Sequence, residues 1–187
     1  TKESVEVIRE AKKSGVPVTC ETGPHYLVLC DEDLQEDGRF KMNPPLRSRN
    51  DREALLEGVA DGTVDVIATD HAPHSAAEKE KGLSGSAMGI VGLETAFPVL
   101  YTKLVRTGMM TFEKLIQMMA VRPREIFDLP VGEIVPGAPA DLCLLDTDCN
   151  WTVDPDKFVT MGRATPFAGW QVQGKNRLTV WRGEVVY

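Results

Sequence analysis

The chain is poor in the residues and segments that mark several classes of protein. Aromatic residues make up 6% of its 187 residues, and histidine occurs only three times. No stretch approaches the roughly 18 consecutive apolar residues of a membrane-spanning helix. Acidic residues outnumber basic ones, which gives a formal net charge of −7 and leaves no basic stripe. We therefore expect neither nucleic acid nor membrane as a partner, because phosphate binding needs clustered Lys and Arg.

The four cysteines follow no metal-binding pattern. Cys20, Cys30, Cys143 and Cys149 include no C-x-x-C pair, which argues against a structural zinc site. Cys20 and Cys143 lie in apolar, strand-like runs and are predicted to be buried thiols. This cysteine usage favours a protein of the reducing cytoplasm that contains no disulfide.

The start of the chain lacks both a Met and the apolar region of a signal peptide. Val5, Ile8 and Ala11 follow helical spacing from the first residues onward, and Gly15 is placed to end that helix. We expect either a processed start or a longer polypeptide of which this chain is a part.

Strands and helices alternate over the first two-thirds of the chain. Asn50, with Glu53 three residues on, predicts a helix cap, and the polar segment 75–86 predicts a long mobile loop. From Gly132 the pattern becomes all-β, with a hairpin in 177–187 that turns at 182–183. Strands are predicted at about 16–20, 40–43 and 64–69, and helices at about 2–14, 51–60, 92–107, 112–120 and 123–128.

This alternation predicts an α/β fold with a parallel sheet. Only about three βα units are present, whereas a closed (β/α)₈ barrel typically needs about 250 residues. We therefore expect residues 1–131 to form the last three βα units and C-terminal helices of a TIM-like barrel. Residues 132–187 are expected to be the C-terminal strands of a small β-sandwich.

The junction Thr69-Asp70-His71-Ala72-Pro73-His74 carries the most chemically capable residues. It follows an apolar run, 64–68, that predicts a buried strand, and α/β barrels place their active sites at such strand ends. Asp70 can bind a metal and shuttle a proton, or it can be an ordinary turn acid. The flanking His71 and His74 favour the functional interpretation.

Two other predicted strands end in ligand-capable side chains. His25 suits zinc coordination, although a hydrogen-bonded loop histidine is the commoner use of such a residue. Asn43 can recognise an amide-like ligand, with ordinary turn chemistry as its alternative. Arg47 and Arg49 are either carboxylate-binding forks or solvated surface residues.

These residues cannot complete a catalytic metal site. His25 and Asp70 supply two candidate ligands, whereas a catalytic zinc needs about three protein ligands plus water. With three histidines in the whole chain, a complete two-metal site is excluded, and the other ligands are expected upstream. Bare backbone at Gly89 either approaches a ligand closely or serves a tight helix entry.

Four motifs occur along the chain in this order: ETGPHYL at 21–27, KMNPPLR at 41–47, TDHAPH at 69–74 and GIVGLET at 89–95. Taken together, they resemble bacterial type I dihydroorotases, which belong to the amidohydrolase superfamily. The tail from Gly132, with Gly137 and 140–142, looks like the entry of that superfamily's C-terminal β-sandwich, and 165–169 fits the same branch. The resemblance spans nearly the whole chain.

The resemblance implies a zinc-dependent cyclic amide hydrolase that reversibly cyclises N-carbamoyl-L-aspartate to L-dihydroorotate in pyrimidine biosynthesis. It implies one or two Zn²⁺ per complete site, with His25 and Asp70 among the ligands. In the hydrolytic direction a metal-bound hydroxide attacks the ring amide, and Asp70 passes the proton to the leaving nitrogen. The positions that match substrate contacts are Asn43, His74, Ala87 and Met88.

This sequence departs from the family pattern at several places. Tyr26 stands where many relatives have a second His, and 87–88 reads Ala-Met where Pro-Phe is usual. The family's His-x-His pair, bridging acid, a further metal-binding His and a substrate Arg belong upstream and are absent here. We therefore expect the C-terminal portion of a dihydroorotase, inactive by itself.

Two alternatives remain open. A hydantoinase or allantoinase would share the fold and metal chemistry, and a non-catalytic homologue would scaffold aspartate transcarbamoylase. His25 and Asp70 argue against a decayed site. A small-molecule substrate and a homodimer are the expected partners, and the open edge of a partial barrel predicts self-association of the chain alone.

Overall fold

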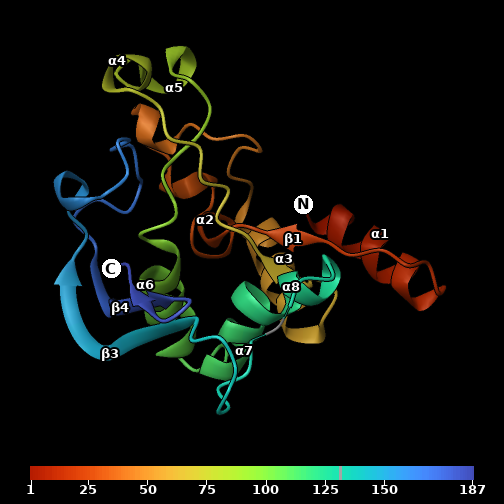
Figure 1. Ribbon diagram of the computed structural model, residues 1–187. Coiled ribbons are helices and arrows are strands. Elements are labelled where there is room, and N and C mark those ends of the chain that lie inside the picture. The colour runs from red at the N-terminus through yellow and green to blue at the C-terminus, as the bar shows by residue number, and fades with distance from the viewer. Residues whose placement is uncertain (131) are drawn as a thin grey trace. The chain divides into compact units, whose positions relative to one another are not determined.

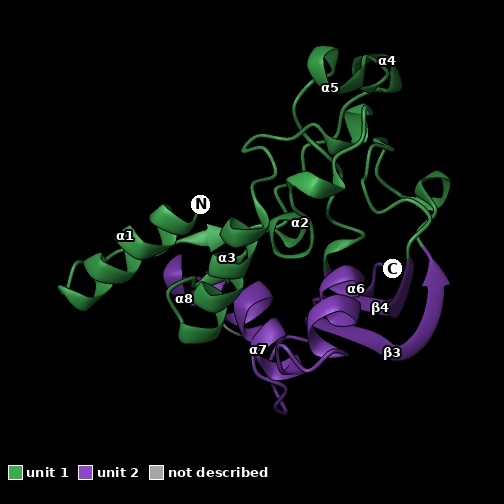
Figure 2. Cartoon of the chain, turned by 180° about the vertical axis from the view of Figure 1, so that it is seen from behind, with its two compact units in different colours: residues 1–96, 153–170 green, residues 97–152, 171–187 purple. Residues whose placement is uncertain are grey.

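The computed structural model describes residues 1–130 and 132–187, and these residues group into two compact units (Figures 1 and 2). Unit 1 comprises residues 1–96 and 153–170, and unit 2 comprises residues 97–152 and 171–187. Each unit is therefore built from two separate stretches of sequence.

Two helices of unit 1 pack closely against each other. Helix α1 (Lys2–Lys13) follows the N-cap Thr1, whose hydroxyl accepts a hydrogen bond from the Ser4 amide, and it matches the predicted helix. Helix α3 (Arg49–Asp61) approaches α1 at Gly58, where an added Cβ would lie 3.0 Å from Val5 Cγ1. The absent side chain at position 58 therefore permits the close contact.

The predicted cap of α3 is wrong. Ser48, not Asn50, is the N-cap residue, and its hydroxyl accepts from the Asp51 amide while the Asp51 carboxylate accepts from the Ser48 amide. This reciprocal pair satisfies two backbone donors at once, so it outcompetes a cap two residues later. The helix therefore begins two residues before the predicted one.

A short parallel pair of strands forms the sheet of unit 1. Strand β1 (Glu21–Thr22) lies beside β2 (Val66–Ile67), with Glu21 opposite Val66 and Thr22 opposite Ile67. A parallel bridge between His71 and Ile90 follows β2 along the chain. Parallel pairing is confirmed, and β2 lies within the predicted strand 64–69 but is shorter. The predicted strand at 16–20 is wrong, since β1 begins only at Glu21, and the two strands do not close a barrel.

The predicted strand at 40–43 is wrong. The chain forms a 3₁₀ turn, η2 (Gly38–Phe40), which begins at Asp37 as the Asp37 carboxylate accepts from the Arg39 amide. Two prolines at 44–45 then remove the backbone donors that a strand would need. The segment 41–47 is therefore irregular.

The predicted loop at 75–86 contains two short helices, α4 (Ala76–Lys79) and α5 (Gly82–Gly85). The Glu78 carboxylate accepts from both the amide and the hydroxyl of Ser75, at 2.9 and 2.6 Å. This capping box starts α4 where the polar composition predicted irregular chain.

The core of unit 1 draws on both of its stretches of sequence. Its smaller elements are α2 (Pro24–Val28), η1 (Asp31–Asp33) and η5 (Pro155–Lys157). The return segment 153–170 pairs with the rest of the unit where the Val91 amide donates to the Ala164 carbonyl at 2.9 Å. The largest fully buried apolar side chains of this unit are Leu27, Ile90, Val91, Val153 and Phe167.

Unit 2 contains the remaining helices, apart from Ala96, the first residue of α6, which belongs to unit 1. Helix α6 (Ala96–Leu100) continues into the π-helical turn η3 (Tyr101–Val105), and α7 (Phe112–Ile116), η4 (Gln117–Val121) and α8 (Arg122–Ile126) form one run. Helices at these places are confirmed, although the first begins four residues later than predicted. Among the described residues, no helix combines the length and apolar character needed to cross a membrane.

A three-stranded antiparallel sheet completes unit 2, in the order β3 (Leu142–Thr152), β4 (Gln171–Trp181) and β5 (Glu184–Val185). The predicted hairpin is confirmed, since its turn residues Arg182 and Gly183 have φ of 50° and 85°.

The burial predicted for the cysteines is only partly right. Cys143 is exposed because it lies near the start of β3, where three successive residues are open to solvent. Cys20 is half-buried, and all four cysteines are free thiols.

Candidate active site at the ends of β1 and β2

Asp70 occupies a strained position just after β2. Its φ of 50° lies in the left-handed region, which residues other than Gly rarely adopt and which recurs at functional sites. Its side chain is 48% exposed, so the carboxylate remains open to a ligand.

Two glycines allow neighbouring backbone to press against the loop 69–74. A Cβ at Gly89 would lie 2.6 Å from Ala72 Cβ, and a Cβ at Gly92 would lie 2.7 Å from the Thr69 carbonyl oxygen. Gly89 has a φ of 143°, which side-chain-bearing residues avoid. The bare backbone of Gly89 therefore serves a close approach to the Asp70 loop, a use that neither predicted alternative named, and its approach to a ligand stays a prediction.

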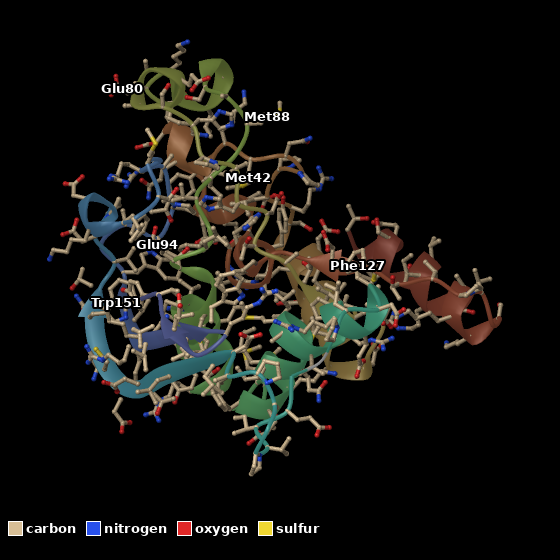
Figure 3. All side chains as sticks on the ribbon, in the orientation of Figure 1. Met42, Glu80, Met88, Glu94, Phe127 and Trp151 are labelled. Carbon is tan, nitrogen blue, oxygen red and sulfur yellow. The ribbon has the colours of Figure 1, made fainter. Side chains whose placement is uncertain are left out.

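His71 anchors this loop through its ring. Its Nδ1 accepts from the amides of Gly92 and Leu93 at 3.0 and 3.3 Å, and its Nε2 lies 3.4 Å from Thr160 Oγ1. The Glu94 carboxylate (labelled in Figure 3) accepts from the Thr160 amide at 3.0 Å. His71 thus holds the neighbours of Asp70 in place, and its Nδ1 lone pair is already in use.

His25 lies in the first turn of α2, after Gly23 and Pro24, and not directly at a strand end as predicted. It is 1% exposed, and its Nε2 lies 3.9 Å from Asp70 Oδ2. Among the described residues, this buried Nε2 has no hydrogen-bond partner. Burial lowers the pKa of His25 to about 4, so the imidazole is neutral, as metal coordination requires.

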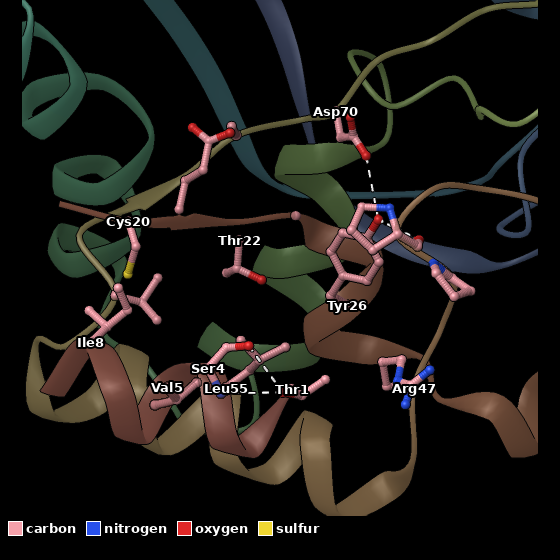
Figure 4. A pocket seen from close by; sticks show the side chains of 16 residues that line it. Thr1, Ser4, Val5, Ile8, Cys20, Thr22, Tyr26, Arg47, Leu55 and Asp70 are labelled. Carbon is pink, nitrogen blue, oxygen red and sulfur yellow. Dashed lines mark hydrogen bonds between the residues drawn. The ribbon is translucent and has the colours of Figure 1, made fainter.

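Tyr26 joins the two sides of the site, although in the sequence it was noted only as a departure from the family pattern, with no role assigned. Its hydroxyl donates to the Pro44 carbonyl at 2.7 Å and lies 3.5 Å from Asp70 Oδ2 (Figure 4). Burial, followed by the negative charge of Asp70, raises the pKa of the phenol, so Tyr26 stays protonated. Its ring packs on His25 at a centroid distance of 4.0 Å.

His74 meets backbone that was expected to contact substrate. Its Nε2 lies 2.9 Å from the Met88 carbonyl oxygen, and because a carbonyl only accepts, Nε2 carries the proton. Its Nδ1 lies 3.9 Å from a Glu78 carboxylate oxygen. The Met88 side chain is exposed (Figure 3).

The remaining predicted contacts lie at the surface. Asn43 is exposed, and within the described part of the chain its side chain makes no hydrogen bond. Arg49 pairs with Glu32 on the surface, which favours its interpretation as a solvated residue. Arg47 lines the pocket that reaches Asp70.

That pocket has a volume of about 360 Å³. Asp70 and Tyr26 lie at one end and the α1 side chains Val5 and Ile8 at the other (Figure 4). The end at Asp70 brings together the carboxylate, the phenol and the neighbouring imidazole. At the opposite end, the hydroxyl residues Thr1 and Ser4 lie beside the apolar side chains of α1.

The described residues contain no group of three or more His, Cys, Asp or Glu side chains placed to hold a metal ion. His25 and Asp70 nevertheless fit two positions of such a site, since the unpartnered Nε2 and the open carboxylate lie side by side. Because catalytic metal sites use about three protein ligands, these two side chains alone are too few for such a site.

Comparison with known proteins points to one family. The model of the amidohydrolase family matches residues 1–186. A dihydroorotase of Brevibacillus brevis is 54% identical over the whole chain, which covers 44% of that protein. The L-hydantoinase (dihydropyrimidinase) of Arthrobacter aurescens superposes with a TM-score of 0.88 at 33% identity, over 99% of this chain and 42% of that one.

A further solved structure bears on the non-catalytic alternative. It is the inactive dihydroorotase-like domain of a Chaetomium thermophilum CAD-like multifunctional protein, with a TM-score of 0.72 at 25% identity. It matches 99% of this chain and 48% of that chain. The chain thus spans less than half the length of the relatives it matches.

Proposed function

The chain belongs to the amidohydrolase family, and we propose that it is the C-terminal portion of a dihydroorotase. The full enzyme would reversibly cyclise N-carbamoyl-L-aspartate to L-dihydroorotate and water. One observation carries this proposal: the buried Nε2 of His25, which has no hydrogen-bond partner in the part of the chain that the structure describes, lies 3.9 Å from the open carboxylate of Asp70. The identity of 54% to a dihydroorotase supports the choice of reaction.

The proposed organisation assigns residues 1–131 to the last part of a TIM-like barrel and 132–187 to a small β-sandwich. The parallel pair β1–β2 and the polar residues that follow it support the first assignment. The antiparallel sheet β3–β4–β5 supports the second.

His25 and Asp70 would hold Zn²⁺ together with ligands from the upstream part of the enzyme. When bound, the metal would supply Lewis acidity and lower the pKa of a coordinated water. The burial that keeps His25 neutral also keeps its Nε2 available to the metal at neutral pH.

Asp70 would move the proton of the reaction. In the hydrolytic direction its carboxylate would accept a proton from the attacking water and give it to the ring nitrogen as the amide bond breaks. The Tyr26 hydroxyl, 3.5 Å from Oδ2, limits where that carboxylate can point. Partial exposure leaves the carboxylate room to reach the substrate.

Substrate contacts are proposed on both sides of Asp70. Asn43, exposed and without a protein partner among the described residues, would bind the substrate's polar edge. His74 would use Nδ1, because its Nε2 proton already contacts Met88. The backbone at Ala87 and Met88 would complete the contact.

The direct test measures hydrolysis of L-dihydroorotate by the purified full-length gene product with added Zn²⁺. We expect Asp70→Asn to reduce kcat about 10³-fold, as loss of a general acid–base does. Asp156→Asn, the same change at an exposed acid of η5, should leave kcat unchanged. Residual activity of Asp70→Asn equal to that of the unaltered enzyme would contradict the proposal.

The same assay distinguishes the alternatives. The present chain alone with Zn²⁺ should be inactive, and addition of the upstream segment should restore turnover. Turnover of hydantoin but not of dihydroorotate would assign the chain to the hydantoinases, to which the structural likeness extends. A full-length protein that turns over neither substrate but binds aspartate transcarbamoylase would support the scaffolding alternative.

A further inference from the structure

Lys79 is a buried cation that binds only backbone oxygens. It is 7% exposed, and its Nζ donates to the carbonyls of Lys41, Ala87 and Gly89 at 3.0, 2.7 and 2.7 Å. An ammonium group has three donors, so all of them are used. Within the described residues, no carboxylate forms an ion pair with it.

These three carbonyls come from two segments far apart in sequence. Residue 41 belongs to the segment that leads to Asn43, whereas residues 87 and 89 flank Met88. The same segments are also joined directly, since the Gly89 amide donates to the Lys41 carbonyl at 3.0 Å. The ammonium therefore closes a junction between the two backbone segments to which we assign substrate contacts.

The backbone of Lys79 is fixed as firmly as its side chain. Its carbonyl accepts from the Ser86 hydroxyl at 2.9 Å, and the Ala87 amide donates to the Glu78 carbonyl at 3.0 Å. At Gly38 an added Cβ would clash with the Lys79 carbonyl oxygen. Helix α4 thus fixes the backbone of Lys79, while the ammonium at the end of the Lys79 side chain binds the carbonyls of residues 87 and 89.

The junction reaches the proposed site through Met88. The Met88 carbonyl contacts His74 Nε2 at 2.9 Å, and the position of a Cβ on Gly89 would be 3.0 Å from the same nitrogen. A change in the direction of the backbone at 87–89 would therefore move the partner that orients the imidazole.

We propose that Lys79 is a positioning residue of the proposed dihydroorotase site. By drawing the three carbonyls together, its ammonium fixes the backbone at 87–89 against His74 and beside the segment leading to Asn43. The role in substrate binding rests on the proposed function, whereas the role as a backbone clamp stands on the geometry alone. Loss of the ammonium should weaken substrate binding more than the chemical step, because Asp70 lies outside the junction.

The first test measures, in the absence of substrate, whether Lys79 restrains the backbone at 87–89. Amide hydrogen exchange is measured on the purified chain with Lys79→Met, which keeps the length and apolar character of the side chain but removes its charge and donors. Lys81→Met makes the same change at an exposed lysine two residues away. We expect the amides of Ala87 and Gly89 to exchange about tenfold faster in Lys79→Met only, in line with the loss of charge-assisted hydrogen bonds.

The second test reads the substrate. In the full-length protein, Lys79→Met should raise KM for dihydroorotate about tenfold and change kcat less than about twofold. Lys81→Met should change neither. Unchanged amide exchange in Lys79→Met would overturn the clamp, and faster exchange with an unchanged KM would overturn its role in substrate binding.

A milder variant guards against a Lys79→Met protein that fails to fold. Ser86→Ala keeps the ammonium and removes the hydroxyl that binds the Lys79 carbonyl. It should accelerate exchange at Ala87 and raise KM in the same direction by a smaller factor; no change in either would count against the inference. Absence of dihydroorotate turnover in the unaltered full-length protein would overturn the proposed function, while amide exchange would still decide the clamp.

Discussion

Replacement of Gly89 by Ala should destabilise the chain far more than the added methyl group suggests. The new Cβ would lie 2.6 Å from both Cβ and the carbonyl oxygen of Ala72, so backbone has to shift. A φ of 143° strains any residue with a side chain, at a cost of about 1–3 kcal/mol. Forcing extra atoms into a packed region costs a further 1–3 kcal/mol or so. Together these terms predict a loss of about 4 kcal/mol in the free energy of unfolding.

Gly15→Ala is the matched control for this prediction. Gly15 also has a left-handed φ, 78°, but nothing lies within 4 Å of its added Cβ. Its substitution should therefore cost only the backbone penalty, about 1 kcal/mol. Urea unfolding of the two variants beside the unaltered chain measures both losses. Equal losses for Gly89→Ala and Gly15→Ala would refute the close packing on the loop 69–74.

Three further predictions concern the site and its frame. Because burial lowers the pKa of His25 from 6.5 to about 4, the unfolded chain takes up a proton first as the pH falls. In the presence of a metal chelator, the free energy of unfolding measured in urea should be greatest above pH 6.5 and fall by roughly 3 kcal/mol towards pH 4. In His25→Gln this dependence on pH should be weaker. Tyr26→Phe should cost about 1 kcal/mol, because it removes the bond to Pro44; an unchanged unfolding free energy would contradict that bond. Ser48→Ala should cost about 1 kcal/mol in thermal unfolding and Asn50→Ala close to nothing, and the reverse order would restore Asn50 as the cap.

The sequence predicted the elements whose causes are local. The spacing of Val5, Ile8 and Ala11 indicated α1, and the turn residues at 182–183 indicated the hairpin, because helical periodicity and left-handed turn residues act over a few positions. The proximity of His25 to Asp70 was a weaker prediction. It depended on the parallel direction of two strands, because parallel strands place the residues that follow them at the same edge of the sheet.

The wrong predictions arose where two local signals competed. Ser75 and Glu78 have the spacing of a capping box, but the polar composition of 75–86 outweighed that signal, so α4 was missed. The same spacing rule selected Asn50 over Ser48, although both choices place an acid three residues later. Which cap forms depends on the geometry of the preceding chain, which a single sequence does not show.

Lys79 and Tyr26 could not be predicted from the sequence, because their roles depend on contacts between distant segments. In the sequence, Lys79 is one of several charged residues in a polar stretch. Its contact with the backbone carbonyl of residue 41 exists only in the folded chain. Tyr26 stands in a position that carried no functional expectation, yet its hydroxyl reaches both Pro44 and Asp70. Long-range contacts of this kind leave no periodic or spacing signal.

The discontinuity of the two units limits how this chain can be cut or shortened. Residues 153–170 belong to unit 1 although they follow β3, a strand of unit 2, in the sequence. A hydrogen bond from the Val91 amide to the Ala164 carbonyl joins this segment to the rest of unit 1. A truncation at 131/132, which the change in sequence pattern suggests as a domain border, would strip Val153 and Phe167 from the core of unit 1. Expression of residues 1–131 alone should therefore give an exposed apolar surface and aggregation, and a split protein should recover solubility only when both pieces are produced together.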